Sequence, residues 1–484
     1  MNYYSVFRLL AFIILFVAGL MFIPLFIAIH YHETTAIWSF VVTLAIMLLF
    51  SLSIIIATQR KHKNIKISVK ASYLFVTLTW VLMSLFGALP LWFAGTMRSF
   101  SSCYFEIMSG FTTTGATAMN NIEIAPMSIL FWRNMTNWLG GMGIVVLFVA
   151  ILPAFGVRGS ALVGAESVGP TKDKLTPQIQ HTAIALWGIY FGLTVLEVIF
   201  LLFGGLSLFD AVTVTFGTMG AAGFAPKNAS IAAFNSAYVE WVCIIFMFLA
   251  GANFALYFRV LQGKYKRLLQ DGEFRIYAAI VAVATGLITL NLCFSGVGGF
   301  FYSLRQAAFQ VVSYITTTGF TSTNYTLWPV FSQFILFTLC FIGGCAGSAG
   351  GGMKVIRIAV MAKLGKTSIT KRIHNNAVTN IKIGNDNVPQ DVVYSIAGFV
   401  GMYITTMLLG TIVVSLAGKD MITSLSSTIL CLGNIGIGFG TIGTTETFAI
   451  FPDWTLWVFS FLMMVGRLEL FTVYSLFTKN FWKK

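Results

Sequence analysis

The sequence predicts an all-α polytopic membrane protein made of four similar units and an extra N-terminal helix pair. Two observations predict this fold class. Of the 484 residues, 57% are hydrophobic and only 10% are charged, a composition far from that of soluble globular domains. In addition, one pattern recurs four times: a long apolar helix, a segment too short to span, a Gly/Thr-rich stretch and a second long apolar helix.

Residues 1–66 lie outside the repeats and are predicted to form a transmembrane helix pair. The first apolar run, about Leu9 to Ile29, has no small-residue cleavage site. It is long enough to span a bilayer at a rise of ~1.5 Å per residue. We therefore interpret it as a retained helix and not as a signal peptide.

Basic residues lie between the predicted spans and predict the topology. Lys and Arg gather in residues 60–70, 259–275 and 354–382 and at the C-terminus. The positive-inside rule places these stretches in the cytoplasm, together with both termini. This arrangement explains the formal net charge of +14, and no nucleic-acid partner is expected.

The four predicted units share one glycine position. Gly115, Gly223, Gly319 and Gly436 recur at intervals of about 100 residues, within TTTGAT, GAAGFA, TTTGFT and GNIGIG. The units cover residues 67–155, 156–262 with a leading cytoplasmic loop, 263–362, and 363–484 with a leading cytoplasmic loop. With the basic stretches inside, both ends of each short segment lie outside, so each segment is a re-entrant hairpin.

Four such hairpins around a common axis would bring their backbones together around a central pore. Carbonyl oxygens in a ring can replace the water around a dehydrated monovalent cation, and glycine lets a carbonyl face inward. Thr316 to Thr318 would add hydroxyl groups to a water-lined passage. The alternative is that Thr and Gly only pack helices, but four copies at matched topology favour a filter. Its candidate ligands are Thr113, Thr114, Gly115, Ala222, Gly223, Thr317, Thr318, Gly319, Ile435 and Gly436.

The residues before these glycines are predicted to form short helices that descend toward the axis. Residues 206–218 and 304–314 are examples. Their C-terminal ends carry partial negative charge, which attracts a cation.

Residues 343–353 interrupt the second long helix of the third unit. Each glycine costs about 1 kcal/mol relative to alanine in a helix, so we expect an intramembrane loop that gates the pore. Two enzyme interpretations fail. Lys354 is displaced by one position from a phosphate-binding pattern, and Ser348 has no His or Asp motif to activate it. The candidate gating residues are Gly343, Gly344, Gly347, Ser348, Gly350, Gly351, Gly352, Lys354 and Arg467.

Arg467 lies near the middle of an apolar run, residues 451–477. A charge at such a depth costs roughly 3 kcal/mol or more and usually faces water or a partner. We expect Arg467 to contact carbonyls of the 343–352 loop and to help close the pore. The alternative is a structural pair with a buried acid such as Glu197 or Glu469. Glu469 is only two residues away and lies on a different helix face.

Seven motifs, taken in order, resemble the Trk/Ktr/HKT superfamily of potassium transport proteins, and within it the bacterial TrkH group. They are SGFTTTGAT, NWLGGMGIVV, MFLAGANFALYFR, SYITTTGFTS, GGCAGSAGGGMKVIR, GNIGIGFG and GRLELFTVYSLF. The resemblance covers essentially the whole chain. It implies four helix-pore-loop-helix units around a central K+ path, filter glycines at Gly115, Gly223, Gly319 and Gly436, and no organic cofactor. A glycine at position 115 resembles the potassium-favouring members.

The resemblance also implies a homodimer in the bacterial cytoplasmic (inner) membrane, with a cytoplasmic nucleotide-binding regulatory ring as partner. The basic stretch 357–376 would dock this ring and contact anionic lipid. The predicted function is channel-like K+ uptake, gated from inside. The alternative is a secondary transporter coupled to an H+ or Na+ gradient, because broken helices and repeats also occur in such folds.

Overall fold

The computed structural model describes residues 3–59, 68–143, 179–374, 380–384, 386–443 and 447–483. Most of the basic stretch 60–70, the end of the first predicted unit and the leading loop of the second therefore lie outside the described residues. The described chain is helical apart from one short antiparallel hairpin, β1 (Lys382–Ile383) and β2 (Asp386–Asn387). The all-α fold class is confirmed.

The N-terminal helix pair consists of α1 (Tyr3–His30) and α2 (Thr34–Gln59), which pack on each other and on the first unit. Glu33, in the turn between them, accepts hydrogen bonds from the backbone amides of Met127, at 2.6 Å, and Ser128, at 3.2 Å. These amides start helix α5 of the first unit. A carboxylate is well placed there, because the first amides of a helix have no partner within the helix.

Each unit begins with a long helix that can span a bilayer, followed by a short one. The long helices are α3 (Val69–Phe93), α8 (Ile179–Phe203), α13 (Gly272–Phe294) and α17 (Gln390–Ser415). The short helices are α4 (Phe100–Phe111), α9 (Leu208–Gly220), α14 (Phe300–Ile315) and α18 (Met421–Gly433). Even the 16 residues of α14 reach only about 24 Å, less than the ~30 Å bilayer core. The predicted short helices are confirmed.

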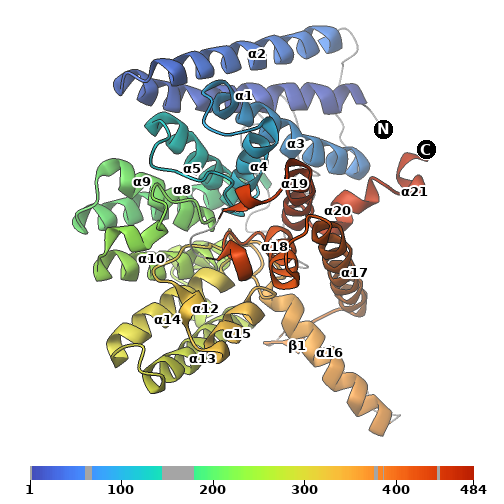
Figure 1. The fold of residues 1–484 in the computed structure, drawn as a ribbon. Coiled ribbons are helices and arrows are strands. Elements are labelled where there is room, and N and C mark those ends of the chain that lie inside the picture. The colour runs from blue at the N-terminus through green and yellow to red at the C-terminus, as the bar shows by residue number, and fades with distance from the viewer. Residues whose placement is uncertain are drawn as a thin grey trace.

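The four units follow one another around the centre of the molecule (Figure 1). The first lies below the α1–α2 pair, the second on the left, the third at the bottom and the fourth on the right. Neighbouring units pack through their short helices, since α9 contacts α5, α14 contacts α10, and α4 contacts α19. The ends of the short helices are thereby directed to one shared region.

The second helix differs from the prediction in units two and four. Its pieces are α5 (Met127–Gly141), α10 (Ala237–Ala250) with α11 (Phe254–Leu261), α15 (Val330–Leu339) with α16 (Val355–Ile373), and α19 (Asp453–Arg467) with α20 (Leu470–Ser475). The prediction of an uninterrupted helix is wrong in units two and four: α10 and α11 meet at 93°, and Glu469 leaves the helical conformation with φ +62°. In unit one, α5 ends at Gly141, and the predicted range beyond residue 143 lies outside the described residues.

The described residues therefore form fewer continuous membrane-spanning helices than the repeat pattern predicted. Among the described residues, six helices are long and apolar enough to cross a membrane, or seven if α10 and α11 count as one bent span. The breaks lie at or beside glycines that pack against residues at the ends of the short helices. The second helices are therefore interrupted where their glycines pack closely at the centre of the molecule.

Helix α16 runs away from the body of the molecule (Figure 1). A small apolar cluster of Val360, Ile383, Val393 and Ile396 packs it against the hairpin and the start of α17. The basic stretch 357–376 falls on α16 as far as Ile373, and residues 375 and 376 lie outside the described residues. The remaining short elements are η2 (Ser230–Phe234), α12 (Lys266–Gln270), η3 (Tyr325–Leu327), η4 (Gly440–Ile442), η5 (Phe448–Ile450) and α21 (Lys479–Trp482).

Candidate functional site

Four glycines, one from each unit, form a closed ring. A β-carbon built on Gly115 would lie 2.6 Å from the Cα of Gly223, and one on Gly223 would lie 2.7 Å from the carbonyl oxygen of Gly319. A β-carbon on Gly319 would lie 2.7 Å from the nitrogen of Gly436, and one on Gly436 would lie 2.8 Å from the carbonyl oxygen of Gly115. No side chain fits at any of the four positions, and the four glycines aligned from the sequence meet in one place.

All four short helices end in the same way. The residue two positions before each ring glycine is left-handed, with φ between +51° and +60°. The amide of the next residue donates to the carbonyl five residues before it, at 2.8–2.9 Å, as in a Schellman C-cap. The left-handed residues are Thr113, Ala221, Thr317 and Asn434. The capping amides belong to Thr114, Ala222, Thr318 and Ile435.

These caps leave backbone carbonyls facing the ring. The carbonyl oxygens of Thr114 and Gly115 lie 2.9 and 2.8 Å from the β-carbon position of Gly436. Those of Thr318 and Gly319 lie 2.9 and 2.7 Å from the β-carbon position of Gly223. Carbonyls that converge on one region from several segments can take the place of water around a cation.

The threonine hydroxyls stabilise the backbone of this region. Thr316 Oγ1 donates to the carbonyl of Val312 at 2.7 Å and lies 2.8 Å from Thr318 Oγ1. The first unit repeats the arrangement with Thr112 and Thr114. In units one and three the hydroxyls therefore bind the loop after the short helix to that helix, a role not predicted from the sequence.

The intramembrane loop of unit three, residues 340–354, crosses beneath the ring. Its two limbs meet where the Gly343 amide donates to the Met353 carbonyl at 2.7 Å. A β-carbon on Gly350 would lie 2.7 Å from the Thr316 carbonyl oxygen. The Gly351 amide donates to Thr317 Oγ1 at 2.7 Å. The predicted break in this helix is confirmed.

The other loop residues named from the sequence contact unit two or each other. The Phe254 amide donates to the Gly347 carbonyl at 3.1 Å, and Gly344 packs against the Gly251 carbonyl. Lys354 is fully buried, and its Nζ donates to the Gly350 carbonyl at 2.5 Å and to Ser348 Oγ at 3.3 Å. Lys354 and Ser348 thus stabilise the loop from within.

Arg467 contacts the loop, as the sequence analysis expected. Its guanidinium donates to the Ala349 carbonyl at 2.9 Å and also to the carbonyls of Gly140 and Gly141, at 2.5 and 2.9 Å. Arg467 is only 7% exposed. These three backbone contacts join units one, three and four.

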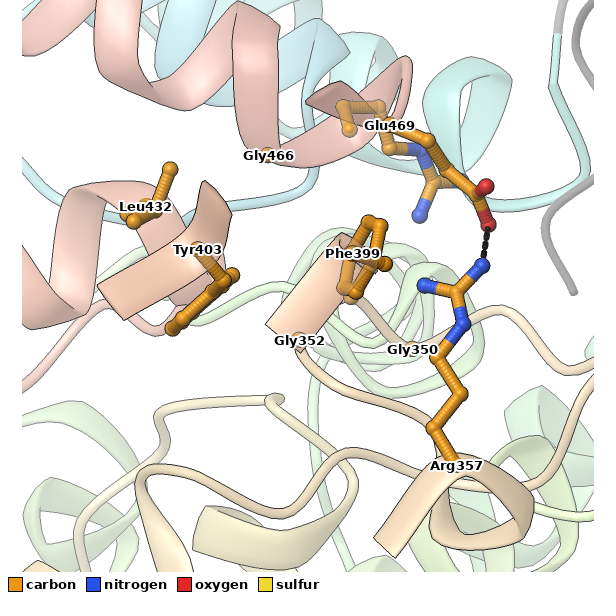
Figure 2. Close-up of a pocket in the computed structure, with 10 residues that line it drawn as sticks. Gly350, Gly352, Arg357, Phe399, Tyr403, Leu432, Gly466 and Glu469 are labelled. Atoms are coloured by element: carbon orange, nitrogen blue, oxygen red, sulfur yellow. Dashed lines mark hydrogen bonds and ion pairs between the residues drawn. The ribbon is translucent and has the colours of Figure 1, made fainter. Parts of the chain in front are cut away.

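A small pocket lies between Gly350 and Gly352 of the loop, Phe399 of α17 and Gly466 near the end of α19 (Figure 2). Arg357 of α16 donates to Glu469 at 2.6 Å and lies 3.8 Å from the centroid of the Phe399 ring. Glu469 follows the end of α19. This ion pair therefore joins the helix after the loop to the break in unit four.

A buried ion pair between Glu106 and Arg133 was not predicted from the sequence. Glu106 of α4 accepts from Arg133 Nε at 2.6 Å, from Thr117 Oγ1 at 2.8 Å and from the Ala118 amide at 2.8 Å. Arg133 lies 3.5 Å from the centroid of the Phe224 ring, in the second unit. Both charges occur in otherwise apolar segments, which was the signal available in the sequence.

Four re-entrant helices whose ends meet at a ring of glycines and carbonyls define a membrane protein for cation transport. The family model described as "TrkH: Cation transport protein" matches residues 38–484. The chain belongs to this TrkH family of cation transport proteins.

Relatives and a solved structure agree with this membership. The chain is 36% identical to the Trk system potassium uptake protein TrkH of Escherichia coli, with 100% of both chains covered. It is 30% identical to the Trk system potassium uptake protein TrkG of the same organism, over 95% of this chain and 94% of that one. The crystal structure of the potassium transporter TrkH from Vibrio parahaemolyticus has a TM-score of 0.89, 32% identity and full coverage of both chains.

Proposed function

We propose that this chain takes up K+ across the bacterial cytoplasmic membrane through a channel-like, gated pathway. The observation that carries the proposal is the ring of Gly115, Gly223, Gly319 and Gly436, with carbonyl oxygens of units one and three directed into it. Such a ring replaces the hydration shell of a dehydrated monovalent cation. The relatives named as potassium uptake proteins support K+ as the transported ion.

The intramembrane loop is the gate in this proposal. It lies against the Thr316 carbonyl at the lower edge of the ring, and two cationic side chains, Lys354 and Arg467, bind its carbonyls. Positive charges below a cation filter oppose the passage of a cation by Coulomb repulsion. Uptake therefore requires the loop to move.

The proposed topology, oligomeric state and partner follow from the resemblance to the same family. We propose a multi-pass protein with both termini in the cytoplasm that functions as a homodimer. The nucleotide-binding regulatory ring would dock on the basic face of α16, with anionic lipid beside it. Displacement of α16 would act on the loop directly, because the loop ends where α16 begins at Val355.

The test is rescue of a potassium-uptake-deficient bacterium at low external K+. The wild type should rescue growth, and Gly319→Ser should not, because a side chain at Gly319 meets the Gly436 backbone. Gly286→Ala, on α13 where a β-carbon meets nothing within 4 Å, is the matched control and should rescue. Equal rescue by Gly319→Ser would remove the filter assignment.

A second assay separates the channel-like pathway from a gradient-coupled transporter. The purified protein in liposomes should take up ⁸⁶Rb+ without an imposed H+ or Na+ gradient. Strict dependence on either gradient would favour the transporter.

A further inference from the structure

Glu273 binds the intramembrane loop and the start of α16 with one oxygen. It lies in the first turn of α13 and is 8% exposed. Its Oε1 accepts a hydrogen bond from the Ala346 amide at 2.8 Å and another from the Ile356 amide at 3.1 Å. Ala346 lies on the descending limb, and Ile356 lies in the first turn of α16. One side chain from outside the loop therefore joins Ala346 of the loop to the first turn of α16.

A carboxylate suits both partners. The Ile356 amide is one of the first amides of α16, which have no acceptor within the helix and carry the positive end of its dipole. The Ala346 amide is a backbone donor in a buried segment, where an unmet donor is costly. A hydrogen bond to an ionised acceptor is also roughly twice as strong as one between neutral groups.

The segment between these two amides holds the contacts that close the pathway. The Ala349 carbonyl accepts from Arg467, the Gly351 amide donates to Thr317, and Gly350 packs on the Thr316 carbonyl. The ends of this segment set its position beneath the ring. Other bonds at its ends, such as that from the Cys345 amide to the Gly251 carbonyl at 2.9 Å, join neutral backbone groups.

We propose that Glu273 is a positioning residue for the gate. It holds the intramembrane loop in its closed shape by binding the Ala346 and Ile356 amides together, and the loop opens when at least one of these bonds is released. This role rests on the proposed function of the loop. It also connects α16, where a cytoplasmic partner would act, to the segment beneath the ring.

The test compares Glu273→Ala and Glu273→Gln with Asp271→Asn. Asp271 is the neighbouring acid and the N-cap of α13, where it accepts from the Phe274 amide at 2.8 Å. Asparagine keeps that cap while removing the charge. Glutamine keeps one acceptor oxygen at position 273, so this variant retains the shape of the site.

Two readouts are measured on purified, monodisperse protein without its regulatory partner. One is basal ⁸⁶Rb+ flux in liposomes. The other is the rate at which a charged methanethiosulfonate labels Cys345, in a background where the other five cysteines are replaced. Cys345 lies in the loop and is 1% exposed, so its labelling reports loop opening and needs no ion flow.

Glu273→Ala should raise both flux and labelling by about tenfold, and Glu273→Gln by less, because each lost bond to a charged acceptor favours the released loop. Asp271→Asn should match the wild type. The proposal is overturned if folded Gln or Ala variants keep wild-type flux and labelling, or if Asp271→Asn raises both equally. Absence of ion flux in the wild type and in every variant would refute the proposed function, while Cys345 labelling would still test the role of Glu273.

Discussion

Replacing Arg467 by alanine removes a side chain that joins three units at the gate. The guanidinium binds the Ala349 carbonyl of the loop and the Gly140 and Gly141 carbonyls of α5. Of these three bonds, that to Ala349 involves the segment that has to move. Its loss therefore measures how strongly Arg467 favours the closed loop.

The magnitude follows from that one bond. A hydrogen bond from a charged donor contributes about 1.5–3 kcal/mol. A loss of about 2 kcal/mol shifts the balance between closed and open loop by about 30-fold, since 1.4 kcal/mol is tenfold. Removal of the positive charge also lowers the electrostatic barrier to a cation. Basal flux should therefore rise by roughly 30-fold.

The assay is ⁸⁶Rb+ flux into liposomes that contain equal amounts of wild type, Arg467→Ala and Arg98→Ala. Arg98 is the matched control: it also donates to two backbone carbonyls, of Ala449 at 2.9 Å and Phe451 at 2.6 Å, but its side chain is 48% exposed and lies far from the loop in sequence. Arg98→Ala should leave basal flux unchanged. Unchanged or reduced flux in folded Arg467→Ala, or an equal rise in Arg98→Ala, would refute the reasoning.

Three further predictions concern contacts around the ring. Glu106→Gln leaves Arg133 buried without its charged partner, which should lower the free energy of unfolding by about 3 kcal/mol, as measured by thermal unfolding in detergent; an unchanged midpoint would contradict this. Thr317→Val removes the acceptor of the Gly351 amide and should raise basal flux about fivefold, whereas wild-type flux would show that this bond does not hold the loop. Glu33→Ala removes the cap of α5 and should cost about 1 kcal/mol, with cation flux retained; loss of flux in folded protein would contradict a purely structural role.

The ring was predictable because it depends on local chemistry repeated along the chain. TTTGAT and TTTGFT mark two of its positions, and spacing and topology supplied the other two, Gly223 and Gly436. All four positions then share the left-handed cap and the close backbone contact. Hydroxyl-rich sequence pointed to this site, although the hydroxyls of Thr316 and Thr318 bond within their own unit.

The broken second helices of units two and four were not predictable in the same way. The six glycines of the third unit make a helix unfavourable by propensity alone. By contrast, Gly251 and Gly466 stand in apolar sequence that a helix accommodates. The breaks depend on tertiary packing, because a side chain at Gly251 meets the Thr316 side chain and one at Gly466 meets the Leu432 backbone. The bonds of Glu273 to Ala346 and Ile356 also join residues more than 70 positions apart.

The central claim is that the ring binds a dehydrated monovalent cation. Anomalous diffraction from crystals of this protein soaked in Rb+ or Tl+ tests it most directly. The account predicts an anomalous peak on the axis of the ring, coordinated by the carbonyl oxygens of Thr114, Gly115, Thr318 and Gly319. A well-ordered ring with no peak among these carbonyls, at ion concentrations that support transport, would contradict it.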